Sequence, residues 1–343
     1  MASTNLDSAD LKSALRGGLL REDVMNKIWD ISKIPLPFTD MIGSETSTQA
    51  YHEWTLDALA PVDLTNARID GADASGNNTI IGTRVGNHHQ QSDKKVRVSY
   101  RANASSVIGQ TKALSYQLMR RQQELRRDVE AIALTNQASV ADDGNAVAGK
   151  AGGLPSWIAT NNNGGTAGGF NTTTGLTVAR IPTANRALTE TFVRDAVQNV
   201  YLQGGDPSIF MSTPGVIRKF SEYLFTSSAR VATLMSEIGQ SAEKATAMGS
   251  VNVFVTDFGT LKLIPNRLQQ QHVDSGTTQV SDVFIFDPEY LAFSYLSGYR
   301  TDDLARTGTA DNKQMLVDWT LTVRTEKSMA LIGDINPLLA ATA

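Results

Sequence analysis

One long helix follows closely on a long polar stretch in this chain, and that order leaves few folds open. Between the polar residues 57–101 and the Gly/Asn-rich residues 142–175, helical spacing predicts a helix over residues 111–137. At about 1.5 Å per residue this helix is roughly 40 Å long, the width of a small domain. One stripe of it is apolar, with Leu114, Leu118, Leu125, Val129 and Ile132. This layout favours a chain that binds other copies of itself over a chain folded around a substrate pocket.

The same helix carries a dense run of charges over residues 120–130. Arg126 and Glu130 are four residues apart, and Glu124 and Arg127 are three apart, so opposite charges are expected to meet on its surface. Each such pair stabilises a helix by only about 0.2–0.5 kcal/mol. We favour a solvated face over a phosphate-binding role for this run.

Residues 51–101 predict a long hairpin. Its return limb alternates, with Val96 and Val98 facing one way and Lys95 and Arg97 the other. The tip, residues 70–78, is rich in turn formers and has no large apolar side chain. Because an isolated hairpin is only marginally stable in water, this one must pack on its own domain or on another subunit. The residues alone leave both possibilities open.

The N-terminal part, residues 10–32, has helical spacing that Gly17 and Gly18 interrupt and that Pro35 and Pro37 end. It is either a surface helix on its own core or an arm that docks on a neighbour. Its start has neither a basic region nor an apolar core, so no signal peptide is expected. The sequence also lacks an apolar run of about 18 residues, so we expect a cytoplasmic chain with no membrane span.

The second half predicts alternating helices and strands without a regular βαβ rhythm, which indicates a mixed α+β class. A helix over residues 191–203 is expected to stop at Gly204 and Gly205 with positive φ. A strand follows at residues 209–211, and a helix begins at Thr213-Pro214. Further strands are predicted at 251–255, with Val251, Val253 and Val255 on one face, and at 261–264, 283–286 and 317–324, the last paired with 328–332.

Composition and motifs argue against catalysis and against a dedicated nucleic-acid site. There are 31 basic and 35 acidic residues, a net charge of -4, and no cysteine. This excludes disulfides, thiolate metal sites and cysteine nucleophiles, and it lacks the basic bias of a nucleic-acid binder. Residues 144–150 match most of a phosphate-binding loop, but Ala151 lacks the hydroxyl that binds Mg²⁺.

The four histidines and the acidic pairs do not suggest a reactive site either. His88 and His89 are adjacent and should point to opposite faces of a strand. An enzyme, for example a hydrolase using Asp142, Asp143 or His88, has no matching geometric set behind it. We therefore predict a protein that is not an enzyme, with no cofactor and no metal.

The order of the segments and several short stretches of sequence resemble those of a known family. Residues 95–100 lead towards the helix that ends with residues 124–134, and Gly153-Leu154-Pro155-Ser156-Trp157-Ile158 follows it. In the second half, residues 256–267, 283–288, 304–308 and 317–332 add to the pattern. The ordered set resembles the major capsid proteins of tailed bacteriophages, which have the fold first seen in phage Hong Kong 97.

The resemblance implies a division of the chain. Residues 1–50 would form an N-terminal arm and 51–101 an extended loop. Residues 102–181 would form a peripheral domain that includes the spine helix 111–137. Residues 182–288 would form the axial domain, and 289–343 would return as strands of the peripheral domain.

The resemblance also implies a structural function. Subunits would assemble as pentamers and hexamers into the icosahedral head shell that encloses phage dsDNA, inside the bacterial host cytoplasm. Both the arm and the loop would then contact neighbouring subunits, and the DNA would meet the shell only as a non-specific lining. Scaffolding, portal and decoration proteins are the expected partners, with the scaffold a separate protein. The alternative is another phage assembly protein, such as a tail-tube or surface-layer subunit, although those tend to be nearly all β.

The expected subunit-contact residues lie on the loop and on the charged helix. Lys94 and Lys95 lie on the return limb rather than at the tip, and no catalytic carboxylate accompanies them, so no covalent cross-link is predicted. The candidates are Asp70, Asp73, Asn77, Asn78, Arg84, Lys94, Lys95, Arg97, Arg120, Arg121, Glu124 and Arg127.

Overall fold

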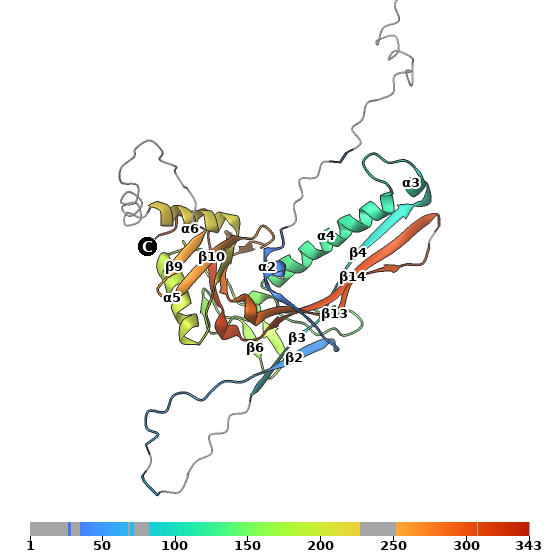
Figure 1. The fold of residues 1–343 in the computed structure, drawn as a ribbon. Helices are drawn as coiled ribbons and strands as arrows, with labels where there is room; N and C mark the ends of the chain where they lie inside the picture. The colour runs from blue at the N-terminus through green and yellow to red at the C-terminus, as the bar shows by residue number, and fades with distance from the viewer. Residues whose placement is uncertain are drawn as a thin grey trace, which may run out of the picture.

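The computed structural model describes residues 27–28, 35–67, 69–71, 82–226, 252–306 and 308–342. Within these residues the chain forms two β-sheets with helices packed against them, and two small hairpins (Figure 1). The combination agrees with the predicted α+β class. None of the described helices is long and apolar enough to cross a membrane.

The first sheet has the strand order β1–β13–β14–β4, formed by Gly43–Thr46, Leu291–Asp303, Ala310–Val323 and Gln90–Ser99. β14 pairs antiparallel with both β13 and β4, so the return limb of the predicted hairpin belongs to the chain's own sheet. Helix α4 (Ala113–Ala133) lies along this sheet (Figure 1). Short helices precede and follow the outer strands: α2 (Pro37–Met41) leads into β1, and α3 (Tyr100–Ala104) follows β4.

The second sheet has the order β5–β15–β12–β8–β10–β9. Helices α5 (Glu190–Leu202) and α6 (Pro214–Thr226) pack on one face of it. The two-residue strand β11 (His272–Val273) pairs with β12. In sheet order, the strands are Asn162–Asn163, Ala330–Ile335, Gln279–Phe286, Ile209–Ser212, Gly259–Pro265 and Val253–Thr256.

Strands β8, β12 and β15 form a wall shared by two hydrophobic cores. Successive side chains of a strand point to opposite faces, so each strand contributes to both sides. In β12, Phe284 and Phe286 enter the core beneath α4 and the first sheet, whereas Val283 and Ile285 enter the core beneath α5 and α6. The two halves of the molecule therefore share structural elements, and neither core is complete without the wall.

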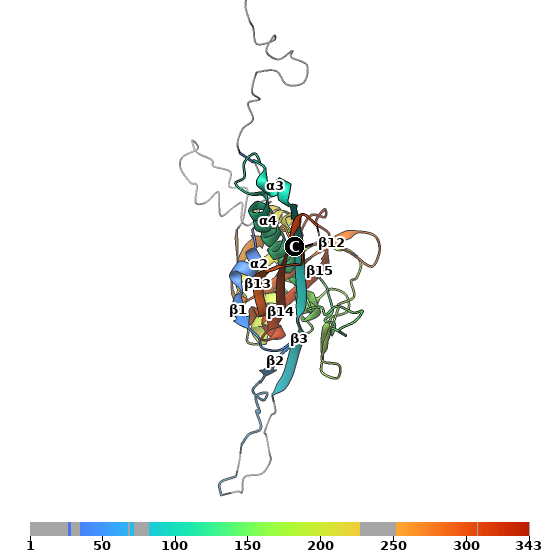
Figure 2. The ribbon, with the colours of Figure 1, turned by 90° about the vertical axis from the view of Figure 1, so that its right-hand side faces the viewer.

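A hairpin of β2 (Tyr51–Leu56) and β3 (Thr83–His88) leads away from the body in both views (Figures 1 and 2). A second hairpin, β6 (Gly169–Asn171) and β7 (Leu176–Val178), lies near its base. Three short 3₁₀ turns connect other elements, at Leu154–Ser156, Pro288–Tyr290 and Glu326–Ser328.

The predicted helices are present, with shifted ends. The helix expected at residues 111–137 is α4, and it is shorter at both ends. The helix expected at 191–203 is α5, whose first turn is capped by the Thr189 side chain accepting a hydrogen bond from Phe192 N. Gly204 follows it with φ +90°, which confirms the predicted stop with positive φ.

The strand expected at residues 251–255 is β9, and Val253 and Val255 share one face of it. That face is exposed, with the two valines at 51% and 63%, and Phe254 on the other face fills the core. β9 is an edge strand, and the large aromatic side chain fixes its register. One strand prediction is wrong. The strand near residues 328–332 was expected to pair with 317–324, but β15 pairs with β12 and β5. The 3₁₀ turn at 326–328 carries the chain from the first sheet to the second.

Candidate subunit-contact surfaces

The segment that follows β2 exposes large apolar side chains to solvent. Within residues 57–71, Leu59 is 98% exposed, Val62 87%, Leu64 93% and Ile69 83%. The hydrogen bonds of its described residues are local, such as those that Thr65 donates to Asp63 from its amide (2.8 Å) and its hydroxyl (2.6 Å). Four large apolar side chains this exposed within one short segment indicate an interaction site. We call these four residues the apolar row.

The base of the β2–β3 hairpin is fixed by aromatic rings. The Trp54 ring lies 5.4 Å from that of Trp157, and the Trp157 ring stacks on Phe170 of β6 at 5.7 Å with an interplanar angle of 2°. The Tyr51 hydroxyl donates a hydrogen bond to the Gly175 carbonyl at 2.9 Å, and burial raises the pKa of this tyrosine. The body therefore holds the root of the hairpin and sets the direction in which it leaves.

A surface rich in positive charge is formed by α4 and the side of β4 that faces it. It carries Lys94, Arg120, Arg121 and Arg127 against Glu124 and Asp128. Lys94 Nζ and Asp128 lie 2.6 Å apart and join the strand to the helix. Arg121 pairs with Glu124 along the helix. We call this surface the β4–α4 face.

Neither of the two expected charge pairs of the helix forms. Glu130 does not meet Arg126 on the surface, because Glu130 is fully buried and the Arg126 guanidinium lies over the ring of Tyr299 at 5.3 Å. Glu124 pairs with Arg121 rather than with Arg127. The prediction of two surface ion pairs at these positions is wrong because the C-terminal half of α4 is covered by other elements.

The structure divides the candidate contact residues among several places. Five of them lie on α4 or on the side of β4 that faces it: Lys94, Arg120, Arg121, Glu124 and Arg127. Lys95 and Arg97 point to the opposite side of β4, because successive strand residues alternate. Arg84 lies on β3, where it pairs with Glu53 at 2.5 Å, and Asp70 is exposed on the projecting segment. Asp73, Asn77 and Asn78 lie outside the described residues. The apolar row was not predicted from the sequence, because these side chains show no strand or helix periodicity.

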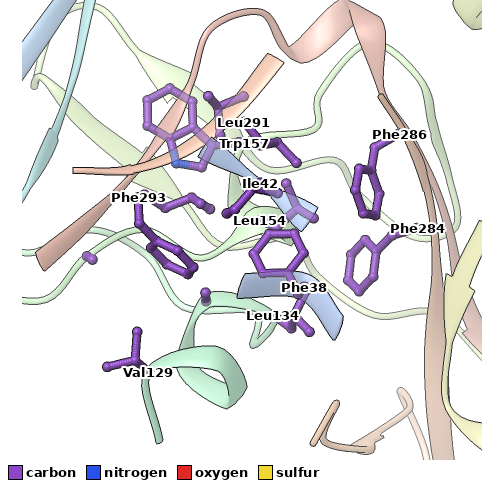
Figure 3. Packing of buried hydrophobic residues seen from close by; sticks show 14 of the residues in the cluster. Phe38, Ile42, Val129, Leu134, Leu154, Trp157, Phe284, Phe286, Leu291 and Phe293 are labelled. Carbon is purple, nitrogen blue, oxygen red and sulfur yellow. The ribbon is translucent and has the colours of Figure 1, made fainter. Parts of the chain in front are cut away.

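A buried carboxylate joins three elements at the end of α4. Glu130 accepts hydrogen bonds from Phe38 N (3.4 Å) and Thr39 N (3.3 Å) of α2, and from Asn266 Nδ2 (2.7 Å) just after β10. The Phe38 ring fills the core beside them, edge-on to Phe286 and Phe293 at 5.8 and 5.9 Å (Figure 3). This junction attaches the first described helix to the body.

A second buried cluster surrounds Arg180, in the crossing between the two halves. Its guanidinium donates to Asp282 at 2.6 Å and to both carboxylate oxygens of Asp334 at 2.9 and 3.1 Å. His272 Nε2 lies 3.0 Å from Asp334. Burial would raise the pKa of Asp334, but hydrogen bonds from His272, Arg180 and Thr183 hold it well below its usual range.

This cluster also resembles a metal site by its residue types. His272, Asp282 and Asp334 bring three ligand atoms within 4.8 Å of one another. However, Arg180 hydrogen-bonds to the same three side chains, so a guanidinium already supplies the positive charge there. The donor set therefore fits a structural ion cluster rather than a metal centre.

One trio has the residue types of a hydrolytic triad. The Ser47 hydroxyl lies 2.8 Å from His89 Nε2, and His89 Nδ1 lies 3.3 Å from Asp318. The Nδ1 and Oδ1 atoms make no hydrogen bond, so the aspartate does not orient the imidazole as a catalytic base requires. The Ser47 amide donates to the Tyr295 carbonyl within the sheet. The trio ties β14 to the segments that follow β1 and β3.

Comparison with known proteins identifies the family. A model of the SU10 major capsid protein family matches residues 3–336. The chain belongs to this family. The predictions of a phage capsid protein and of a place in the virion shell are thereby confirmed.

Other similarities agree with this capsid family. Over 116 residues, 33% of this chain, the capsid protein is 38% identical to the major capsid protein of Escherichia phage Phieco32. The matched region spans 32% of that relative, about a third of its length. The capsid of cyanophage A-1(L) matches with a TM-score of 0.62 and 12% identity, over 92% of this chain and 97% of that one.

Two further solved structures share the fold. The capsid of a native GTA particle has a TM-score of 0.59 and 13% identity, over 96% and 99% of the two chains. The SrpI encapsulin of Synechococcus elongatus has a TM-score of 0.55 and 11% identity, over 94% and 95%. The predicted capsid fold is therefore confirmed.

Proposed function

We propose that this capsid protein assembles as pentamers and hexamers into an icosahedral head that encloses phage dsDNA. In this assembly the projecting segment of one copy, residues 57–71, binds to the β4–α4 face of the next copy. The apolar row carries this proposal. Four large side chains that are more than four-fifths exposed cannot belong to the subunit's own core. A self-complementary chain can bury them against a second copy, and a head-to-tail contact of this kind closes into rings.

Charge supports the pairing of these two surfaces. Residues 57–71 contain Asp57, Asp63 and Asp70 but only one basic residue, Arg68. The β4–α4 face has an excess of positive charge. Opposite charges on the two surfaces favour this register and disfavour like-with-like contacts. Avidity over many copies then makes individually modest contacts hold.

The domain roles suggested by the resemblance are part of the same proposal. Residues 1–50 act as the arm and 51–101 as the extended loop. Residues 102–181 with 289–343 form the peripheral part, and 182–288 form the axial part. Scaffolding, portal and decoration proteins act as separate partners. The protein works without catalysis and without a cofactor, and its inner surface contacts DNA only non-specifically.

The test is electron microscopy of the purified protein, alone and with a scaffold, for the wild type and a variant with Leu59, Val62, Leu64 and Ile69 changed to Ser. We expect closed shells from the wild type and a folded, soluble, unassembled variant. Leu338→Ser is the matched control, because Leu338 is 83% exposed but lies near the C-terminus. Normal shells from the quadruple variant would refute the role of the apolar row. Open tubes from the wild type would favour the tail-tube alternative.

A further inference from the structure

Glu130 is a titratable group that the assembly function does not use. It is 0% exposed, and it accepts hydrogen bonds from three neutral N–H donors among the described residues. Two of these donors are the backbone amides of Phe38 and Thr39, at the start of α2. The residue before this helix, Leu36, offers no side-chain cap, so the Glu130 carboxylate fills that role from another element.

Among the residues that the structure describes, no cation is in direct contact with this carboxylate to balance its charge. The third donor, the Asn266 amide, is neutral. On the packed elements, Asp40 and Arg267 are exposed, and Arg126 lies over Tyr299. Arg127 is half-buried on the helix and is not among the hydrogen-bond partners. Buried charges are normally paired, so an ionised Glu130 is costly in this position.

The surroundings of Glu130 can also accommodate its protonated form. The Thr39 hydroxyl is buried beside the Glu130 carboxyl, whose pKa it lowers, and it has no other hydrogen-bond partner among the described residues. A hydroxyl can donate to a carboxylate or accept from a carboxylic acid. Thr39 can therefore serve either protonation state of Glu130, and the junction need not break when the proton arrives.

We propose that Glu130 is a proton-dependent clamp on residues 35–46, which comprise α2 and β1. The protonated carboxyl group holds this segment against α4 and the residues after β10 more tightly than the ionised group does. The inference concerns the subunit itself and does not depend on assembly.

The direction follows from linkage between protonation and opening. Burial raises the pKa of Glu130 above its ordinary 4.5, and the hydrogen bonds from Asn266, Thr39 and Phe38 offset this only in part. If residues 35–46 detach, Glu130 meets water and regains the ordinary value. The closed state therefore binds the proton more strongly, so protonation favours closure and a rise in pH favours opening.

Hydrogen exchange of the α2–β1 amides in the unassembled subunit tests the clamp, with rates corrected for the intrinsic effect of pH. In the wild type, opening should become up to about tenfold rarer for each pH unit of acidification between 4.5 and the raised pKa. Glu130→Gln should give protection that no longer depends on pH in this window. Asp128→Asn, two residues away on the same helix, should keep the wild-type dependence.

A second variant and a direct readout keep the test decisive if Glu130→Gln folds poorly. Thr39→Val removes a hydroxyl that lowers the pKa of Glu130, so it should extend the pH dependence to higher pH while the fold is retained. Infrared difference spectra should show a buried protonated carboxyl band in the wild type, absent from Glu130→Gln. Wild-type protection that is flat or weakens on acidification would overturn the clamp, as would unchanged pH dependence in Glu130→Gln.

Discussion

At the scale of single residues, the Arg180 guanidinium balances the buried charges of Asp282 and Asp334 where the two halves meet. Arg180→Met should leave Asp282 and Asp334 buried without a guanidinium, which typically destabilises a protein by about 3–5 kcal/mol. Urea unfolding of the unassembled subunit measures this loss. Arg194→Met is the control, because Arg194 pairs with Glu190 on an exposed surface and should lose no more than about 1 kcal/mol. Equal losses in the two variants would contradict the assignment.

Asp334 should be the main cause of the fall in the free energy of unfolding at acidic pH. Its pKa in the folded chain lies below 3.8, the value for an unperturbed aspartate, so its stabilising contribution is present above pH 3.8 and is lost as pH falls below that value. The raised pKa values of Glu130 and Asp282 act in the opposite sense. Asp334→Asn should therefore lower the free energy of unfolding at neutral pH and flatten its decline in acid. A parallel decline in wild type and variant would count against this role.

Gly333 lies against the Arg180 cluster and leaves no room there for a larger side chain. A Cβ atom at Gly333 would lie 2.6 Å from the Arg180 guanidinium, and Asp334 next to it has φ +63°. None of these contacts is visible in the sequence, because Arg180, His272, Asp282 and Asp334 come from distant segments without local spacing. Glu130 was equally hidden, since it lies beside the apolar stripe of α4 and is buried only by elements from elsewhere in the chain.

At the scale of elements, the aromatic base decides whether the β2–β3 hairpin is a stiff projection. Trp54→Ala should remove the ring that lies on Trp157 and destabilise the hairpin by about 2 kcal/mol, between a surface contact and a full core truncation. Hydrogen exchange should accelerate in β2 and β3 but not in α4. Trp54→Phe keeps an aromatic ring there and should behave nearly as the wild type. Unchanged exchange in Trp54→Ala would show that the hairpin is held by other contacts.

Elements were predictable where periodicity runs long, and pairings were not. The apolar stripes of α4 and α5 and the alternation in β14 are local signals, so these elements were found with small errors at their ends. The partner of β15 depends on contacts with residues far away in sequence, and pattern alone could not choose β12 over β14. Likewise, one buried Phe254 outweighed two valines in fixing the face of β9.

At the scale of the whole molecule, the two proposed contact surfaces carry opposite charge, so assembly should depend on ionic strength. Because salt screens exposed charges over about 8 Å at physiological strength, added NaCl should slow shell formation followed by light scattering. Arg121→Glu, on the β4–α4 face, should assemble more slowly at low salt and show a weaker salt dependence. Arg218→Glu, exposed on α6, makes the same charge change elsewhere and should match the wild type. Slow assembly in both variants would point to net charge instead.

The shared wall has a consequence for how the sequence can drift. Every residue of β12 from Val280 to Phe286 is buried, so this strand has no outer side on which substitutions pass unnoticed. A saturation library selected for soluble subunit should show an unbroken block of intolerance across β12. Tolerance should alternate in β4, where Val96 and Val98 are buried and Lys95 and Arg97 are exposed. Surface residues of the capsid protein are thus free to change between related phages, whereas the sequence of β12, between the two cores, should change little.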